Sequence, residues 1–163
     1  MFELLNILKN CNDDDYQDIK NNIHKYYDLL DFVQETISDK NYIVGKRCLI
    51  NMMCYLGLEK SKHARADDIG KYVVSKSLLL KRRELNYNSG KLKLEITSYN
   101  YLRTVIKKLK NDIKQTSQYK LLKNVLIFLN HNDIYWFINL ITKDYSMNQK
   151  VYDLIKFKKM VME

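Results

Sequence analysis

Apolar residues recur at intervals of three and four positions along most of this chain, and this spacing is typical of helices with one buried face. From Ile19 to Val33, for example, the apolar residues fall on one side of a helix and Asp and Lys on the other. Apart from Lys46 and Arg47, the segment 42–58 is apolar on nearly all sides, which predicts the central helix of the fold. The pattern predicts helices over residues 2–10, 15–37, 42–58, 66–80, 97–113, 119–129, 133–143 and 149–161.

The composition favours a single all-α domain. The chain has 163 residues, of which 46% are hydrophobic and 29% charged, with no Pro and only four Gly. This length suits one compact domain, and the scarcity of turn-forming residues argues for long helices. One exception follows the turn signal Asn88-Ser89-Gly90, where apolar and charged residues alternate over 91–96. We therefore predict one all-α domain over 1–163, with about seven to eight helices and a short extended segment near 91–96.

The cysteines and the hydropathy pattern indicate an intracellular protein. Cys11, Cys48 and Cys54 are odd in number and form no CxxC pair, so we expect reduced thiols. The N-terminal segment lacks the features of a secretory signal, and no apolar run approaches the ~20 residues that a membrane helix needs. The Lys-, Asn-, Ile- and Tyr-rich composition resembles that of viral proteins, for which the location would be the host nucleus or cytoplasm.

Charge is distributed unevenly along the chain. The formal net charge is +9, but residues 1–39 contain three basic and nine acidic residues, whereas residues 40–163 contain 25 basic and 10 acidic residues. A basic body of this density attracts a polyanion, and nucleic acid is the most common one. A solvated lysine-rich surface without a partner would explain the same charge. The acidic residues 1–39 could pack against a basic body in the same chain or another chain, or bind a protein partner.

A row of basic residues runs along one predicted helix. Arg103, Lys107, Lys110 and Lys114 recur at intervals of four, three and four, so that on one helix they would form a ridge beside the apolar stripe. Neighbours in such a row lie about 5–6 Å apart, which is on the scale of phosphate spacing along a DNA strand. The ridge could therefore follow a backbone without reading its sequence.

Motifs for catalysis or metal binding are absent from the sequence. His24, His63 and His131 are isolated, with no HExxH pattern, nucleophile elbow or glycine-rich phosphate loop nearby. The run Asp13-Asp14-Asp15 is explained better by a favourable helix start than by a metal site, because consecutive helical residues point in different directions. We expect no catalytic residue, no metal and no cofactor.

The segment NDIYWFINLITKDYSMN, residues 132–148, resembles a helix and its following loop in a known family. The similarity is to the N-terminal DNA-binding domain of eukaryotic-type ATP-dependent DNA ligases, most closely the ligase III and poxvirus ligase branch. In that family the loop lies on the DNA backbone at the minor groove. The matching residues are Asn132-Asp133, Leu140-Ile141, Asp144 and Met147-Asn148.

The resemblance extends to other parts of the chain. LEITSYNYL, residues 94–102, is similar to the family segment that begins Leu-Thr-Ile, and Asp68-Ile69-Gly70 and residues 2–10 resemble elements nearer its N-terminus. The chain departs from the family in having no Pro, in a loop after Asn148 that is about three residues shorter and lacks Gly, and in the absence of the Lys-x-Asp-Gly nucleotidyl-transfer motif. The resemblance thus implies a DNA-binding fold that cannot ligate by itself.

Together these observations predict a non-catalytic protein that grips duplex DNA, intact or nicked, through phosphates and the minor groove with little sequence specificity. The aromatic residues Tyr135, Trp136 and Phe137 are assigned to the core. The candidate DNA-binding residues are Lys91, Lys93, Arg103, Lys107, Lys110, Lys114, Lys143, Ser146, Asn148 and Lys150.

Two alternatives stay open. A small α-helical viral protein, Bcl-2-like or similar, would bind a host protein in a groove and block signalling, and the apolar helix around 50–58 fits such a class. A ligase-like fold could also persist as a protein-docking module, with its basic residues scattered in space. The sequence does not show whether the protein prefers nicked, intact or single-stranded nucleic acid. It also does not show whether the chain acts alone or within a ligase.

Overall fold

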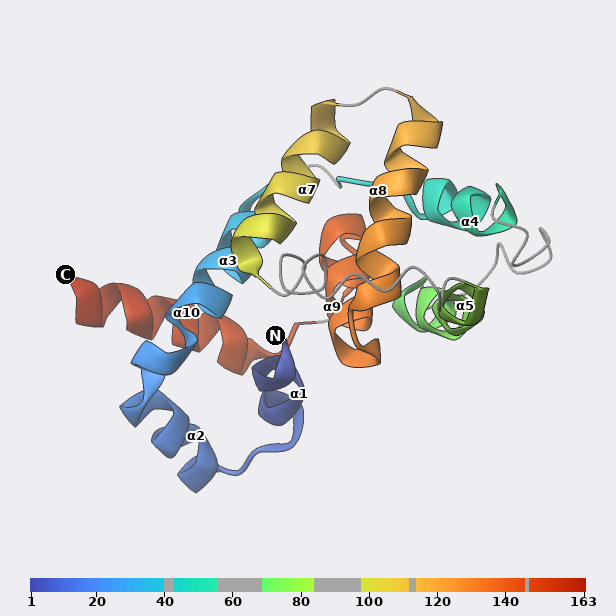
Figure 1. The fold of residues 1–163 in the computed structure, drawn as a ribbon. Helices are drawn as coiled ribbons and strands as arrows, with labels where there is room; N and C mark the ends of the chain where they lie inside the picture. The colour runs from blue at the N-terminus through green and yellow to red at the C-terminus, as the bar shows by residue number, and fades with distance from the viewer. Residues whose placement is uncertain (40–42, 56–68, 84–97, 112–113, 146) are drawn as a thin grey trace. The chain divides into compact units, whose positions relative to one another are not determined.

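The computed structural model describes residues 1–39, 43–55, 69–83, 98–111, 114–145 and 147–163. Every regular element in these ranges is a helix, as Figure 1 shows, which confirms the all-α prediction. The described residues form nine α-helices and one 3-10 helix, slightly more than the seven to eight predicted. The predicted extended segment at 91–96 lies outside them.

The chain divides into two compact units. Unit 1 combines residues 1–40 with residues 145–163, and unit 2 comprises residues 41–144. The organisation of 1–163 as one domain stays a prediction.

Unit 1 is built from both ends of the chain. Its helices are α1 (Glu3–Asn10), α2 (Asp13–Asn21), the 3-10 helix η1 (Ile23–Tyr26), α3 (Tyr27–Ser38) and α10 (Gln149–Met162). The amphipathic faces of α1, α3 and α10 pack together, and the rings of Phe2 and Phe32 lie 5.8 Å apart between centroids. On α10, Lys158 pairs with Asp31 of α3.

The predicted single helix over 15–37 is wrong, because the chain breaks at Asn22. The Asn22 side-chain amide donates to the carbonyl of Asp18 over 2.9 Å, and the backbone N–H of Asn22 donates to the carbonyls of Asp18 and Ile19, each over 3.2 Å. An Asn side chain can replace backbone partners in this way, which favours a helix end over continuation. The helix pair α2 and α3 results, with η1 between them.

Unit 2 contains α4 (Lys46–Tyr55), α5 (Ile69–Arg83), α7 (Tyr99–Asn111), α8 (Gln115–Phe128) and α9 (His131–Thr142). Its most enclosed helix is α9, in which every residue from Ile134 to Thr142 except Tyr135 is buried. Trp136 and Phe137 belong to the core, as predicted. The helix predicted over 42–58 is confirmed as α4, but it is not the central helix, because it buries one face and exposes Lys46, Arg47, Asn51 and Tyr55.

The close packing of α5 on α9 depends on a glycine. A methyl group built on Gly70 would meet the side chain of Asn139, with the nearest atom, Oδ1, only 2.4 Å away. Asn139 is buried on α9. The absence of a side chain at Gly70 therefore permits the contact between these two helices.

Candidate nucleic-acid interface

The helices α7 and α8 concentrate positive charge within unit 2. They carry six basic residues, and a seventh, Lys114, is the N-cap of α8. Neither helix contains an Asp or Glu; the one acidic residue between 99 and 128 is Asp112, which lies outside the described residues. The basic residues of the α7–α8 pair are Arg103, Lys107, Lys108, Lys110, Lys114, Lys120 and Lys123.

A hollow of about 680 Å³ opens between the two helices, and we name it the α7–α8 groove. On α7 its lining residues follow the spacing of one helical face, and the first two turns of α8 supply the opposite wall. Lys107, Lys108 and Lys114 are all exposed at this hollow. The described residues that line it are Thr104, Lys107, Lys108, Asn111, Lys114, Ser117 and Leu121.

The start of α8 adds to the positive potential of the groove. Lys114 occupies the N-cap position in an extended conformation (φ −86°, ψ 116°), and its side chain makes no capping hydrogen bond. The first N–H groups of a helix lack intrahelical partners and carry the positive end of its dipole. Lys107, Lys108 and Lys114 line the same hollow as this helix start, and a helix start of this kind favours a bound anion.

The structure changes the predicted basic row. Because α7 ends at Asn111, Lys114 does not continue the row on that helix but begins the next one. Arg103 is half-buried and donates to the side chain of Asn100 over 2.8 Å, whereas Lys107 and Lys110 are exposed on α7.

Sequence reasoning missed Lys108. It lies beside Lys107 in the sequence and off the predicted row, yet both line the groove. The Asn111-Asp112 pair is the signal for a chain reversal here, and a reversal turns the face of Thr104, Lys108 and Asn111 towards the next helix.

The second predicted contact segment, residues 143–150, is divided between the units. Lys143 ends α9 in unit 2 with a left-handed backbone (φ 59°), whereas Asn148 and Lys150 belong to unit 1. Ser146, like Lys91 and Lys93, lies outside the described residues. Contact between DNA and these residues stays a prediction.

Within unit 1, Asn148 and Lys150 hold the start of α10. The Asn148 side chain accepts from the N–H of Lys150 over 2.9 Å and donates to the carbonyl of Leu8 over 3.1 Å. The Lys150 amine donates to the carbonyl of Cys11 over 2.9 Å and lies 5.6 Å from the ring centre of Tyr16. Burial, with smaller contributions from Asp153 and Cys11, raises the pKa of Tyr16. Both residues thus have structural partners already.

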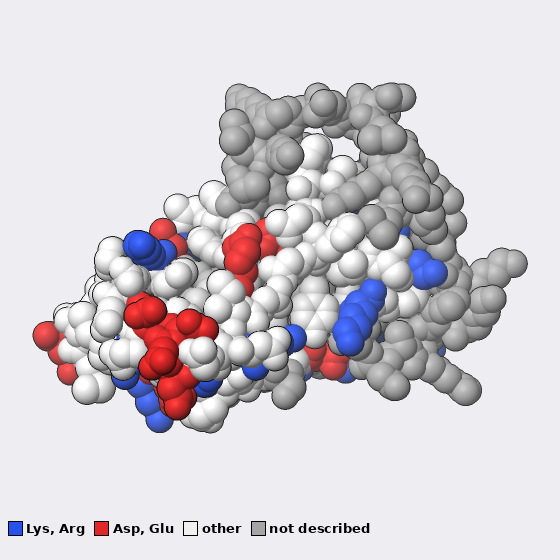
Figure 2. Space-filling view, turned by 90° about the horizontal axis from the view of Figure 1, so that it is seen from below, with Lys and Arg blue, Asp and Glu red and all other residues white. Residues whose placement is uncertain are grey.

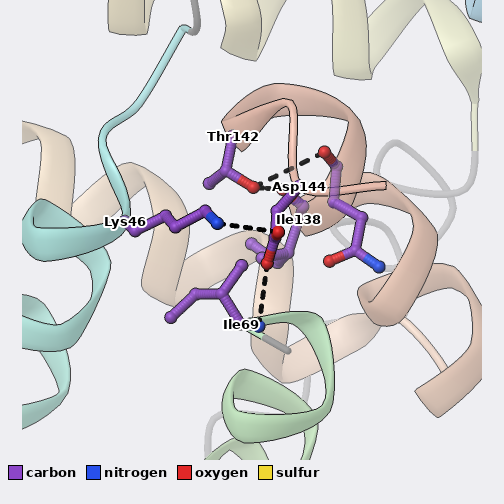
Figure 3. A network of polar contacts seen from close by, with 6 residues as sticks. Lys46, Ile69, Ile138, Thr142 and Asp144 are labelled. Atoms are coloured by element: carbon purple, nitrogen blue, oxygen red, sulfur yellow. Dashed lines mark hydrogen bonds and ion pairs between the residues drawn. The ribbon is translucent and has the colours of Figure 1, made fainter. Parts of the chain in front are cut away.

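Asp144 joins three parts of unit 2, as Figure 3 shows. One carboxylate oxygen accepts from the Lys46 amine over 2.7 Å, and the other accepts from the N–H of Ile69, the first residue of α5, over 3.1 Å. Burial raises the pKa of Asp144, but the hydrogen bonds from Lys46 and Ile69 together outweigh it and leave the pKa below its usual value. The carboxylate therefore stabilises the end of α9 against α4 and α5.

Other chemistry finds little support in the described residues. No group of three His, Cys, Asp or Glu side chains there could hold a metal ion, and no helix among them is long and apolar enough to cross a membrane.

Figure 2 shows a cluster of Asp and Glu side chains on the face in view. The acidic first turn of α2, Asp13 to Asp15, is exposed, and Asn12 caps the helix through a 2.8 Å bond from the N–H of Asp15.

Comparison of this chain with profiles of known protein families, with curated proteins and with solved structures finds no match.

Proposed function

We propose that this protein binds duplex DNA through its phosphates, with little sequence preference and without catalysing a reaction. The observation that carries the proposal is the α7–α8 pair, whose two helices bear cations and no carboxylate. Such a surface gains free energy when its cations displace the counterions that surround a nucleic acid.

The resemblance to the DNA-binding domain of DNA ligases supports the same function. It is strongest over residues 94–148, and α7, α8 and α9 lie in that range. The family grips DNA through backbone contacts, and phosphate contacts fix position without reading bases. A role in DNA repair follows if the protein prefers a nick.

The salt dependence of binding tests the proposal. We expect a labelled duplex to bind at low salt and its affinity to fall steeply between about 50 and 200 mM salt, measured by fluorescence anisotropy. Intact duplex, nicked duplex and single strand are compared under the same conditions. No binding to any of them at the lowest salt would sink the proposal and favour a protein-docking role, to be pursued by pull-down of host proteins.

Charge-reversal variants test which surface of the protein contacts DNA. Lys107→Glu with Lys108→Glu should weaken DNA binding and reduce its salt slope by about 2, since two phosphate contacts are lost. Lys156→Glu with Lys159→Glu is the matched control, because it makes the same change in net charge on the exposed face of α10 in unit 1. Circular dichroism checks that both variants fold. Equal losses in the two variants would argue against the α7–α8 pair as the contact surface.

A further inference from the structure

The α7–α8 groove is a hollow. A row of cations can follow a continuous DNA backbone without any hollow. We propose, on the basis of the DNA-binding function above, that this groove holds the phosphorylated end of a DNA strand: a terminal phosphate together with its unpaired nucleotide. The protein would then prefer open, phosphorylated ends to an uninterrupted duplex.

The charge of the groove suits a terminal phosphate. Lys107 and Lys108 on one wall and Lys114 on the other line the same hollow, and none of the described residues that line it carries a carboxylate. Lys107 and Lys108 form no ion pair within the described part of the chain. A phosphate monoester has a second pKa of about 6 and carries nearly two negative charges near neutral pH, whereas a phosphodiester within the strand carries one. Several cations at one hollow therefore favour the terminal phosphate over the phosphodiesters within the strand.

The shape of the groove suits a nucleotide better than a bare phosphate. Its volume of about 680 Å³ lies in the range of sites for small organic molecules. The lining on α7 runs from Thr104 to Asn111, a rise of about 10 Å along the helix. A strand end can lie along a hollow of this length, with its phosphate near the lysines that line both walls.

The lining also contains the groups that a nucleotide needs besides charge. Leu121 and the methylene stems of the lysines offer apolar surface to a sugar and base, and Thr104, Asn111 and Ser117 offer hydrogen-bonding groups. None of the described lining residues is aromatic, so they offer no platform on which a base could stack. We therefore expect little preference among the four bases.

The first experiment compares three forms of one duplex by anisotropy: a dumbbell closed by loops at both ends, an open duplex with 5′-hydroxyl ends, and an open duplex with 5′-phosphate ends. We expect the phosphorylated duplex to bind about tenfold more tightly than the other two, the size of one charge-assisted hydrogen bond. Equal affinity for all three would overturn the end site and leave DNA binding intact. A lack of binding to all three would instead overturn the underlying function.

A pair of variants tests whether the groove produces the preference. Lys108→Gln removes a groove lysine and should abolish the advantage of the phosphorylated ends. Lys120→Gln removes an equal charge from an exposed position on α8 outside the lining, and should leave the ratio of affinities unchanged even if all affinities fall. Retention of the full ratio in Lys108→Gln would contradict the assignment to this groove.

Competition identifies which part of the strand end is bound. Thymidine monophosphate should displace the phosphorylated duplex, and thymidine without its phosphate should not. Inorganic phosphate should compete more weakly than the mononucleotide, because it makes no contact with Leu121. Equal competition by phosphate and mononucleotide would overturn the nucleotide part of the proposal.

Discussion

Gly70 and Asn139 show how one side chain sets the approach of two helices. A methyl group at Gly70 would lie within 3 Å of all three terminal atoms of the Asn139 side chain. Asn139 is buried, so it has little room to move, and its Oδ1 finds no hydrogen-bond partner among the described residues. The oxygen and the glycine therefore share one tightly filled space.

We predict that Gly70→Ala destabilises the protein by about 1–3 kcal/mol. Overpacking of a filled core costs this much, and it outweighs the usual gain of 0.5–1 kcal/mol from replacing a helical glycine by alanine. Urea denaturation measures the change. In the double variant with Asn139→Ala the clash is absent, so its loss of stability should be smaller than the sum of the two single losses. Additive losses would show that the contact is not the cause.

Asp144 gives the protein a pH-dependent element. Its folded-state pKa is lowered, so its contribution to stability is present above the unfolded value near 3.8 and is lost as the pH falls through the folded value. We predict that Asp144→Asn costs about 1 kcal/mol at pH 7, a modest amount because the Lys46 side chain is half exposed to solvent.

The measurement is urea denaturation of both proteins from pH 7 down to pH 3. The difference between them should be constant in the upper part of this range and shrink below about pH 4. A difference that does not change with pH would show that the charge of Asp144 contributes nothing.

At the scale of elements, the start of α8 has an unfavourable N-cap residue, Lys114, which also belongs to the charged surface of the groove. Lysine is a poor N-cap, because its cation faces the positive end of the helix dipole and it offers no acceptor to the free N–H groups. We predict that Lys114→Asp raises the free energy of unfolding by about 1 kcal/mol and weakens DNA binding. Thermal denaturation and anisotropy measure the two effects. A gain in stability with unchanged DNA affinity would remove Lys114 from the contact surface.

The helices that could be predicted from the sequence are those with strong periodicity and clear ends. The last helix was expected over 149–161 and runs over Gln149–Met162, because Asn148 supplies a capping oxygen and the apolar face is regular. The break at Asn22 was missed because apolar periodicity continues across it. Separate helices were predicted over 97–113 and 119–129, but the groove between α7 and α8 was missed, because periodicity within a helix does not show which of its faces the next helix lies against.

At the scale of the whole molecule, the two units differ in charge and in construction. Unit 2 contains 20 basic and 8 acidic residues, whereas unit 1 contains 8 basic and 11 acidic residues. The charge asymmetry predicted from the sequence thus largely follows the units. That unit 1 draws on both ends of the chain could not be predicted, because periodicity within a helix does not say which distant helix it packs against.

We predict that deletion of residues 149–163 unfolds unit 1 and leaves unit 2 folded. The deletion removes Val151, Leu154 and Ile155 from the core that α1 and α3 share with α10. Hydrogen exchange should show loss of protection in α1 and α3 and retained protection in α5 and α9. Simultaneous loss in both units would instead support the prediction of a single cooperative domain.

The composite construction of unit 1 also bears on the order of folding during synthesis. All residues of unit 2 leave the ribosome before residues 145–163, so unit 2 can fold while the N-terminal segment still lacks its partner. Phe2, Leu4, Leu5 and Leu8, buried in the finished protein, stay exposed for that interval. Residues 1–39 of the nascent chain are therefore open to chaperones and to aggregation until residues 145–163 have been made.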